Sequence, residues 1–284
     1  MAGVAGLGLG GAGYATFVEP EEISVERLDI HLSRLPEGFD GLKIAQISDL
    51  HYGPFTGVRE IGAAADHVNA LGADLVVVTG DFITSPLLER TSTPASTTLA
   101  NAGRCARVLS RIRAPLGVFA ALGNHDVTTN PGYISEVLQA VGIRVLRNGR
   151  APLERSGARL WLAGVDDVLD GQPRLDQALA GVPRREPLVL MAHEPDFADE
   201  ASLQNVDLQL SGHSHGGQVR LPLIGAPYLP RLARKYPYGH YLIRQMQLYT
   251  NRGIGTIGVP MRFGAPPEVT LFTLRAGRPA GAAH

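Results

Sequence analysis

The sequence has very little cysteine, and neither sign of charge is in excess. Its 284 residues include one cysteine, Cys105, so no intrachain disulfide forms and the redox compartment stays open. The neighbours of Cys105 have a helical pattern, which predicts a buried structural thiol. With Lys+Arg 26 against Asp+Glu 27, the formal net charge is -1. Nucleic-acid binders usually carry a basic excess, so nucleic acid is an unfavoured partner.

The amino terminus lacks positive charge. Met1 to Phe17 are almost all small or apolar, and the first basic residue is Arg27. A signal peptide needs a basic start, and a spanning helix needs about 20 apolar residues. Two interpretations of residues 1–20 remain open: a flexible leader, or the remaining part of an export signal or membrane anchor. For 21–284 we predict a single domain, because neither a linker nor an internal repeat is visible.

Short apolar runs that each end in a polar cluster organise the rest of the chain. Runs of this kind are typical of strands buried on both faces. Between them lie stretches with one apolar face at helical spacing. The runs are Leu42–Ile47, Leu75–Val78, Val118–Leu122, Leu188–Ala192 and Leu208–Leu210, and the helical stretches include Val58–Leu71, Leu99–Ile112 and Tyr133–Val141. This alternation predicts an α/β sheet whose polar strand ends gather at one edge.

Other segments read as shorter, partly alternating strands separated by glycine and proline. We expect them to form a second sheet packed on the first. They are Arg159–Val165, Tyr241–Ile243, Gln247–Thr250 and Val269–Leu274. The stretch Thr84–Thr98 is rich in serine, threonine and proline, which indicates a surface loop.

The polar clusters supply the ligand types that divalent cations prefer. Carboxylate, amide and imidazole groups bind hard or borderline metals, and a carboxylate is able to bridge two ions. Five of the nine histidines lie at strand ends, within or beside such clusters. The candidate ligands are Asp49, His51, Asp81, Asn124, His193, His213 and His215. The sequence therefore predicts a metal site at the shared sheet edge.

The order of these motifs resembles the signature of the calcineurin-like metallophosphoesterases. The motifs are Asp49-x-His51, Gly80-Asp81, Gly123-Asn124-His125-Asp126, His193 and Gly212-His213-x-His215. The C-terminal part is similar to one bacterial branch, the YkuE/YaeI-like phosphodiesterases, in the segments 215–222, 251–255 and 266–270. The resemblance implies a four-layer α/β/β/α sandwich of two mixed sheets, in agreement with the two expected sheets.

The resemblance also implies roles for individual residues. One divalent ion would bind Asp49, His51, Asp81 and His215, and the second would bind Asp81, Asn124, His193 and His213, with Asp81 as the bridge. Mn2+ is the favoured ion, with Fe or Zn2+ as alternatives. His125 would stabilise the phosphate charge and protonate the leaving group. Asp126 would orient His125 or cap a helix. Arg252 would contact a phosphate oxygen or form a surface ion pair.

The function that follows is hydrolysis of a phosphate ester by a phosphodiesterase or pyrophosphatase. The substrate would be a small or lipid-linked phosphate, since some relatives act on UDP-2,3-diacylglucosamine. A nuclease or cyclic-nucleotide phosphodiesterase and a non-catalytic scaffold are the alternatives. Between Val219 and Tyr241, apolar and aromatic residues lie beside a basic cluster, which suits peripheral membrane contact or a loop packed on the sheet. We expect a membrane-associated or exported bacterial protein, with a soluble cytoplasmic one as the alternative. The oligomeric state stays open.

Overall fold

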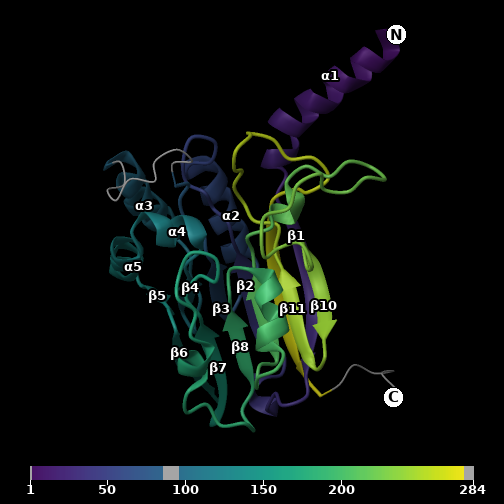
Figure 1. The fold of residues 1–284 in the computed structure, drawn as a ribbon. Coiled ribbons are helices and arrows are strands. Elements are labelled where there is room, and N and C mark those ends of the chain that lie inside the picture. The colour runs from purple at the N-terminus through teal and green to yellow at the C-terminus, as the bar shows by residue number, and fades with distance from the viewer. Residues whose placement is uncertain (1, 86–95, 278–284) are drawn as a thin grey trace.

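Two mixed sheets pack face to face, with helices on both outer faces (Figure 1). The computed structural model describes residues 2–85 and 96–277, with side chains from residue 10 onward. Each sheet has six strands. The predicted four-layer α/β/β/α fold is thus confirmed.

The first sheet has the strand order β1-β12-β2-β3-β4-β5. Strands β2 to β5 run parallel, and β12 pairs antiparallel with β2. The strands are β1 (Ser24–Leu32), β2 (Lys43–Ile47), β3 (Leu75–Thr79), β4 (Val118–Ala121), β5 (Ile143–Val145) and β12 (Glu268–Ala276). Helices α2 (Val58–Ala70), α3 (Ser96–Leu109) and α5 (Pro131–Ala140) cover its outer face, and the short α4 (Asn124–Thr129) follows β4.

The second sheet has the order β10-β11-β9-β8-β7-β6. Strands β7, β8, β9 and β11 are parallel, and an antiparallel strand lies at each edge. The strands are β6 (Gly149–Arg155), β7 (Ala158–Gly164), β8 (Leu188–Met191), β9 (Leu208–Ser211), β10 (Gly239–Ile243) and β11 (Met246–Thr250). The short helices α6 (Leu175–Leu179) and α7 (Ala198–Ala201) pack on its outer face.

Strand periodicity divides the apolar side chains among three layers of core. On β3, Leu75 and Val77 point toward the second sheet, and Val76 and Val78 point toward the helices. All four are fully buried. Side chains of a strand alternate between its faces, so a strand covered on both faces must be apolar throughout. The structure thus explains why the run Leu75–Val78 contains no polar residue.

The assignment of strands to sheets differs from the sequence prediction in two respects. Strands β8 and β9 belong to the second sheet, although their apolar runs resemble those of β2 to β4. Strand β12, which we expected in the second sheet, lies in the first between β1 and β2. Both sheets have their inner strands covered on two faces, so the apolar pattern does not distinguish them. Residues 86–95 of the expected surface loop lie outside the described residues, and Ser96 already begins α3.

The amino-terminal residues form a helix, α1 (Ala2–Phe17), that projects from the body of the molecule (Figure 1). Its glycine content did not predict a helix. Its end is tied to the segment before β12, because Arg262 N donates to Ala15 O at 2.8 Å and Ala265 N donates to Glu19 Oε1 at 2.8 Å. Within the described residues, every helix is too short or too polar to cross a bilayer. The domain boundary at residue 20 stays a prediction.

Candidate metal centre

The ends of five strands converge at one edge of the sandwich. Asp49 and His51 follow β2, Asp81 follows β3, Asn124 follows β4, His193 follows β8, and His213 and His215 follow β9. Ligand atoms of Asp49, His51 and His215 lie within 4.8 Å of one another, and those of Asp81, His193 and His213 form a second such group. A third group contains His51, Asp81 and His125 and links the first two. The residues are therefore arranged to bind a metal centre.

The backbone at this edge is unusual. Five of the seven candidate ligands have a positive φ, between 44° and 67°: Asp49, His51, Asp81, His213 and His215. For residues other than glycine this left-handed conformation costs on the order of 1–3 kcal/mol each, and it concentrates at functional sites. The loops thus hold their side chains in positions that an unstrained loop would not give.

Glycines next to the ligands allow the loops to approach one another. A Cβ built on Gly123 would lie 2.7 Å from His193 Nε2 and 2.7 Å from Asp81 N. A Cβ on Gly212 would overlap the carboxylate of Asp49. Neither glycine has a positive φ, so close packing is what requires them.

In the first group, nitrogen and oxygen atoms face a common point. His51 Nε2 lies 3.0 Å from His215 Nε2 and 3.5 Å from Asp81 Oδ2. His215 Nε2 lies 3.4 Å from Asp49 Oδ1. Two imidazole nitrogens and two carboxylates that point at one another are the arrangement expected around a shared cation.

In the second group, each imidazole uses one ring nitrogen in a hydrogen bond to a backbone carbonyl, so its other ring nitrogen is available to a metal ion. His193 Nδ1 donates to Thr79 O at 2.6 Å, so its Nε2 is left to face Asp81 Oδ2 at 3.2 Å. His213 Nε2 donates to Arg231 O at 2.9 Å, which leaves its Nδ1. Asn124 Oδ1 is buried and has no hydrogen-bond partner among the described residues. Fixing one imidazole nitrogen in this way is how proteins orient the other toward a metal.

Burial and mutual charge shift the pKa values of the cluster. Burial raises the pKa of Asp49 to about 6 and lowers those of His51 and His213 to about 3 and about 4. Burial would also raise the pKa of Asp81, but the neighbouring imidazoles, His193 first, outweigh it and hold that pKa well below its usual value. His51 and His213 are therefore neutral beside an ionised Asp81, which are the protonation states that bind a cation. Burial lowers the pKa of His193, but the Asp81 carboxylate outweighs it and holds that pKa well above its usual value, so a cation would have to displace the proton of His193.

His125 lies beside the candidate ligands but is held differently. The backbone N–H of Ser85 donates to His125 Nδ1 at 3.0 Å, and the Ser85 hydroxyl lies at the same distance. Because an N–H only donates, Nδ1 is the acceptor and the neutral ring carries its proton on Nε2. Sequence reasoning missed Ser85, which lies at the start of the predicted surface loop and has no motif of its own.

Asp126 does not contact the His125 ring through its carboxylate. Its oxygens accept the backbone N–H groups of Asp81, Phe82 and Gly123, at 2.8, 3.0 and 3.0 Å. It lies in the first turn of α4, so the capping alternative describes it better than the prediction that it orients His125. Its effect on the centre is to fix the backbone of the proposed bridge, Asp81.

Arg252 lies in an ion-pair network. Its Nε contacts Glu268 Oε2 at 2.5 Å and its Nη2 contacts Glu26 Oε1 at 2.6 Å, and it does not line the cavity. The geometry supports the ion-pair alternative and gives no support to a phosphate contact. Sequence reasoning missed another arginine, Arg262, which is fully buried and whose Nη2 lies 3.4 Å from His215 Nδ1. It follows the Gly-rich segment that includes residues 251–255, but Arg262 itself is not part of any motif that the sequence analysis identified.

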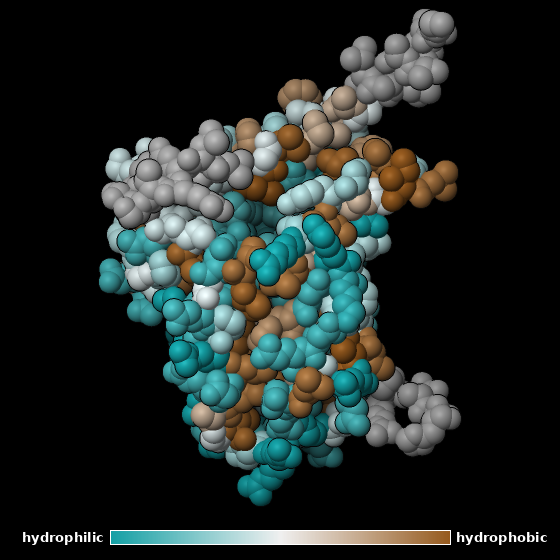
Figure 2. Space-filling view, viewed as in Figure 1, coloured by the Kyte–Doolittle hydropathy of each residue, from teal (hydrophilic) through white to brown (hydrophobic). Residues whose placement is uncertain are grey.

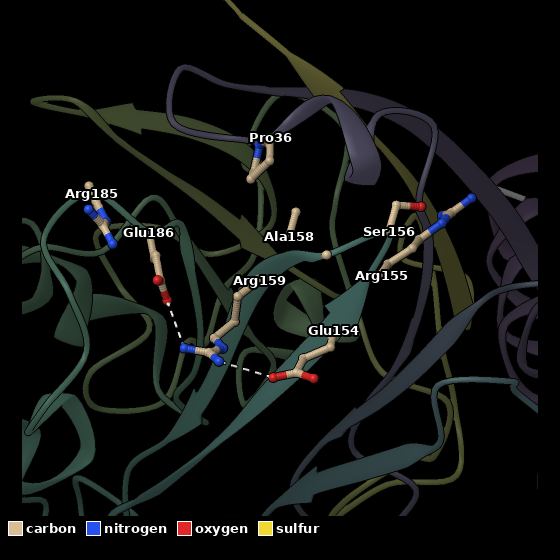
Figure 3. A pocket seen from close by; sticks show the side chains of 9 residues that line it. Pro36, Glu154, Arg155, Ser156, Ala158, Arg159, Arg185 and Glu186 are labelled. Atoms are coloured by element: carbon tan, nitrogen blue, oxygen red, sulfur yellow. Dashed lines mark hydrogen bonds and ion pairs between the residues drawn. The ribbon is translucent and has the colours of Figure 1, made fainter.

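A cavity of about 680 Å³ opens over the centre. Its lining includes His51, Asp81, Asn124, His125 and His213. A second cavity, of about 570 Å³, lies at the opposite strand ends, near the β6–β7 turn (Figure 3). There Arg159 pairs with Glu154 and Glu186, and the lining contains no histidine. The candidate ligands thus surround only the first of these two cavities.

Comparison with known proteins agrees with this site. The family model of the calcineurin-like phosphoesterases matches residues 42–217, and the chain belongs to that family. It is similar to the uncharacterized metallophosphoesterase YkuE of Bacillus subtilis, with 35% identity over 94% of this chain and 91% of the relative. It is also similar to the phosphodiesterase YaeI of Escherichia coli (31% identity, 93% of each chain). The UDP-2,3-diacylglucosamine pyrophosphatase LpxG of Chlamydia trachomatis is 27% identical over 91% of each chain. The chain is thus a metallophosphoesterase.

Proposed function

We propose that this protein is a phosphodiesterase or pyrophosphatase that uses two divalent metal ions. The observation that carries the proposal is the meeting of six candidate ligands from four strands in two adjoining groups, with the seventh, Asn124 after β4, lining the same cavity. One ion would bind Asp49, His51, Asp81 and His215, and the other Asp81, Asn124, His193 and His213. A mixed set of oxygen and nitrogen ligands admits Mn2+, Fe and Zn2+. Of these three we favour Mn2+.

When bound, such a pair of ions clamps a phosphate and supplies a nucleophilic water at neutral pH. The chain's own residues then complete the reaction. His125 carries its proton on Nε2, because Ser85 N–H occupies Nδ1. That N–H is placed to donate a hydrogen bond to the leaving oxygen and so to stabilise the negative charge that develops there as the phosphorus–oxygen bond breaks. Asp126 holds the Asp81 backbone, so the bridging carboxylate keeps its position.

The names of two relatives support the substrate class. One relative is a phosphodiesterase and another a pyrophosphatase of a nucleotide-linked lipid. We propose a phosphate-containing small molecule or a lipid-linked phosphate as the substrate. For location we propose membrane association or export, which the uncharged sequence of α1 supports.

Hydrolysis of bis-p-nitrophenyl phosphate tests the proposal. With Mn2+ or Zn2+ the full chain should release p-nitrophenol, and a chelator should abolish the release. Asp81→Ala should remove activity, and His125→Ala should lower kcat by roughly 10²–10⁴-fold. His240→Ala, on the edge strand β10, is the control and should retain activity. Activity that survives both site substitutions would rule out the centre as described.

A further inference from the structure

The cavity over the metal centre has a second wall that is mostly apolar, beside Arg231. It is formed by Val219, Pro227, Tyr228, Pro230, Ile257 and Val259, which we call the apolar arm. Phosphate chemistry needs only the metal side. An apolar wall of this size beside an ionic centre fits a hydrocarbon group attached to the phosphate, since removal of apolar surface from water is favourable.

The apolar arm is built into the loops that carry the ligands. Gln218 Nε2 donates to Ile257 O at 3.0 Å and to Val259 O at 3.1 Å, and Gln218 Oε1 accepts Ile257 N at 2.9 Å. Gln218 follows the helical turn that begins at His215. A Cβ on Gly217 would overlap Ala226, so the two sides of the loop pack closely. The arm is therefore preformed, and its position is fixed relative to the metal centre.

Exposed apolar side chains surround the mouth of the arm. Leu221, Leu223, Ile224 and Val259 are 40%, 108%, 72% and 46% exposed, and we call these four residues the rim patch. Figure 2 shows apolar side chains gathered on the projecting loop beside the end of α1. Scattered exposed leucines are ordinary, whereas a contiguous group beside a ligand cavity marks a contact surface.

Backbone hydrogen bonds link the loop that carries the rim patch to the start of the chain. Arg220 N donates to Phe263 O, and the neighbouring Arg262 N donates to Ala15 O, so the segment 262–263 joins the rim loop to α1. Phe17 and Val18, just beyond, are 75% and 41% exposed. The 16 residues of α1 contain no charge. Exposed apolar residues thus occur both at the cavity mouth and at the end of the helix.

The segment that carries most of the rim patch has charges of one sign, and one of them is paired outside the segment, because Lys235 Nζ lies 2.6 Å from Asp199 Oδ2. Residues 217–238 contain Arg220, Arg231, Arg234 and Lys235 and no acidic residue. Apolar side chains flanked by basic side chains complement an anionic bilayer, because cations near such a surface attract the acidic lipid headgroups. A second copy of the chain would bring the same positive charges together, so this surface fits anionic lipid better than itself.

We propose that the rim patch rests on an anionic lipid surface and that the apolar arm takes an aliphatic chain of the substrate. The substrate is then an amphiphilic phosphodiester or pyrophosphate that reaches the metal centre from the membrane. This inference rests on the proposed function for the reaction itself. It adds the substrate class, the membrane partner and the residues that contact them.

Binding and hydrolysis on vesicles test the inference. The full chain with Mn2+ is sedimented with vesicles of phosphatidylcholine containing phosphatidylglycerol, and separately with pure phosphatidylcholine. We expect binding to the anionic vesicles and a loss of roughly tenfold or more in Leu223→Asp/Ile224→Asp. The matched control is Leu203→Asp/Leu242→Asp, which adds the same charge at leucines that are 62% and 71% exposed elsewhere. The control should bind like the wild type.

Chain dependence is measured without a membrane. The kcat/KM for dihexanoyl phosphatidylglycerol, below its micellar concentration, should exceed that for glycerophosphoglycerol roughly tenfold or more. Ile257→Asn should reduce this ratio. Equal rates on the two diesters, equal vesicle binding by both double variants, or dimer formation through the rim patch in light scattering would overturn the inference. If bis-p-nitrophenyl phosphate is not cleaved either, the proposed function fails; if it is cleaved, only the lipid inference fails.

Discussion

The substitution Gly123→Ala tests how closely the metal loops pack. A Cβ at this position would lie 2.7 Å from His193 Nε2, whereas ordinary contact begins at 3.4 Å. The ring must therefore retreat by about 0.7 Å, and Asp81, whose Oδ1 is nearer still, must move further. Because a displacement of about 1 Å costs about 10²-fold in rate, we expect kcat/KM to fall roughly 30- to 100-fold. The barrier would rise by about 2–2.7 kcal/mol.

The assay is hydrolysis of bis-p-nitrophenyl phosphate at saturating Mn2+, with Mn2+ affinity measured by calorimetry. Gly103→Ala is the control, because Gly103 lies in α3 and nothing would contact its Cβ within 4 Å. It should leave kcat/KM unchanged and stabilise the fold by about 0.5–1 kcal/mol, as alanine favours helix. If Gly123→Ala keeps more than about a third of wild-type kcat/KM and its Mn2+ affinity, the close packing does not position the ligands and the reasoning is refuted.

Three further predictions follow from the same contacts. Asp126→Ala removes the acceptor of three buried backbone N–H groups, so the free energy of unfolding in urea should fall by about 3 kcal/mol or more. Asp126→Asn keeps one acceptor oxygen and should lose less. Wild-type stability in both variants would contradict this prediction. Burial raises the pKa of Asp49 to about 6, so below pH 6 a cation must displace the proton of this carboxyl group. The Mn2+ affinity, measured by calorimetry, should therefore fall about tenfold between pH 7 and pH 5. An affinity that does not change over this pH range would contradict binding through Asp49. Arg252→Ala removes the ion-pair partner of the 2% exposed Glu268, which keeps the hydrogen bonds that other side chains donate to its Oε1. The free energy of unfolding should fall by about 3 kcal/mol with KM unchanged, because a buried charge loses its counterion. A raised KM at full stability would instead favour the phosphate contact.

The sequence was informative where chemistry and strand ends coincide. Asp49, Asp81 and His193 each lie just beyond a mostly apolar run, and the family order of the motifs led to the site that the structure assembles. The four-layer fold was predictable for the same reason. Partners that act through the backbone were not, because the Asp126 carboxylate accepts N–H groups that every residue possesses. Ser85 likewise contacts His125 through its own N–H as well as its hydroxyl.

Strand order was the other part that local pattern did not determine. Strand β12 lies between β1 and β2, a pairing between residues more than 200 positions apart in sequence. Both β8 and β12 are mostly buried, although β12 also contains polar residues, so neither burial nor composition tells which sheet takes them. The burial of Arg262 also depends on tertiary contacts, since its acceptors Arg252 O, Gly255 O and Ala265 O come from a folded loop.

The positive φ angles at Asp49, His51, Asp81, His213 and His215 have a consequence for the protein in the cell. Each such residue favours loosening of its loop, whereas a cation held at 100 times its dissociation constant adds about 2.7 kcal/mol to the folded state. Proteases remove chains that open, so starvation for metal should shorten the lifetime of the protein before it limits turnover. The amount of intact protein would then follow the supply of the ion.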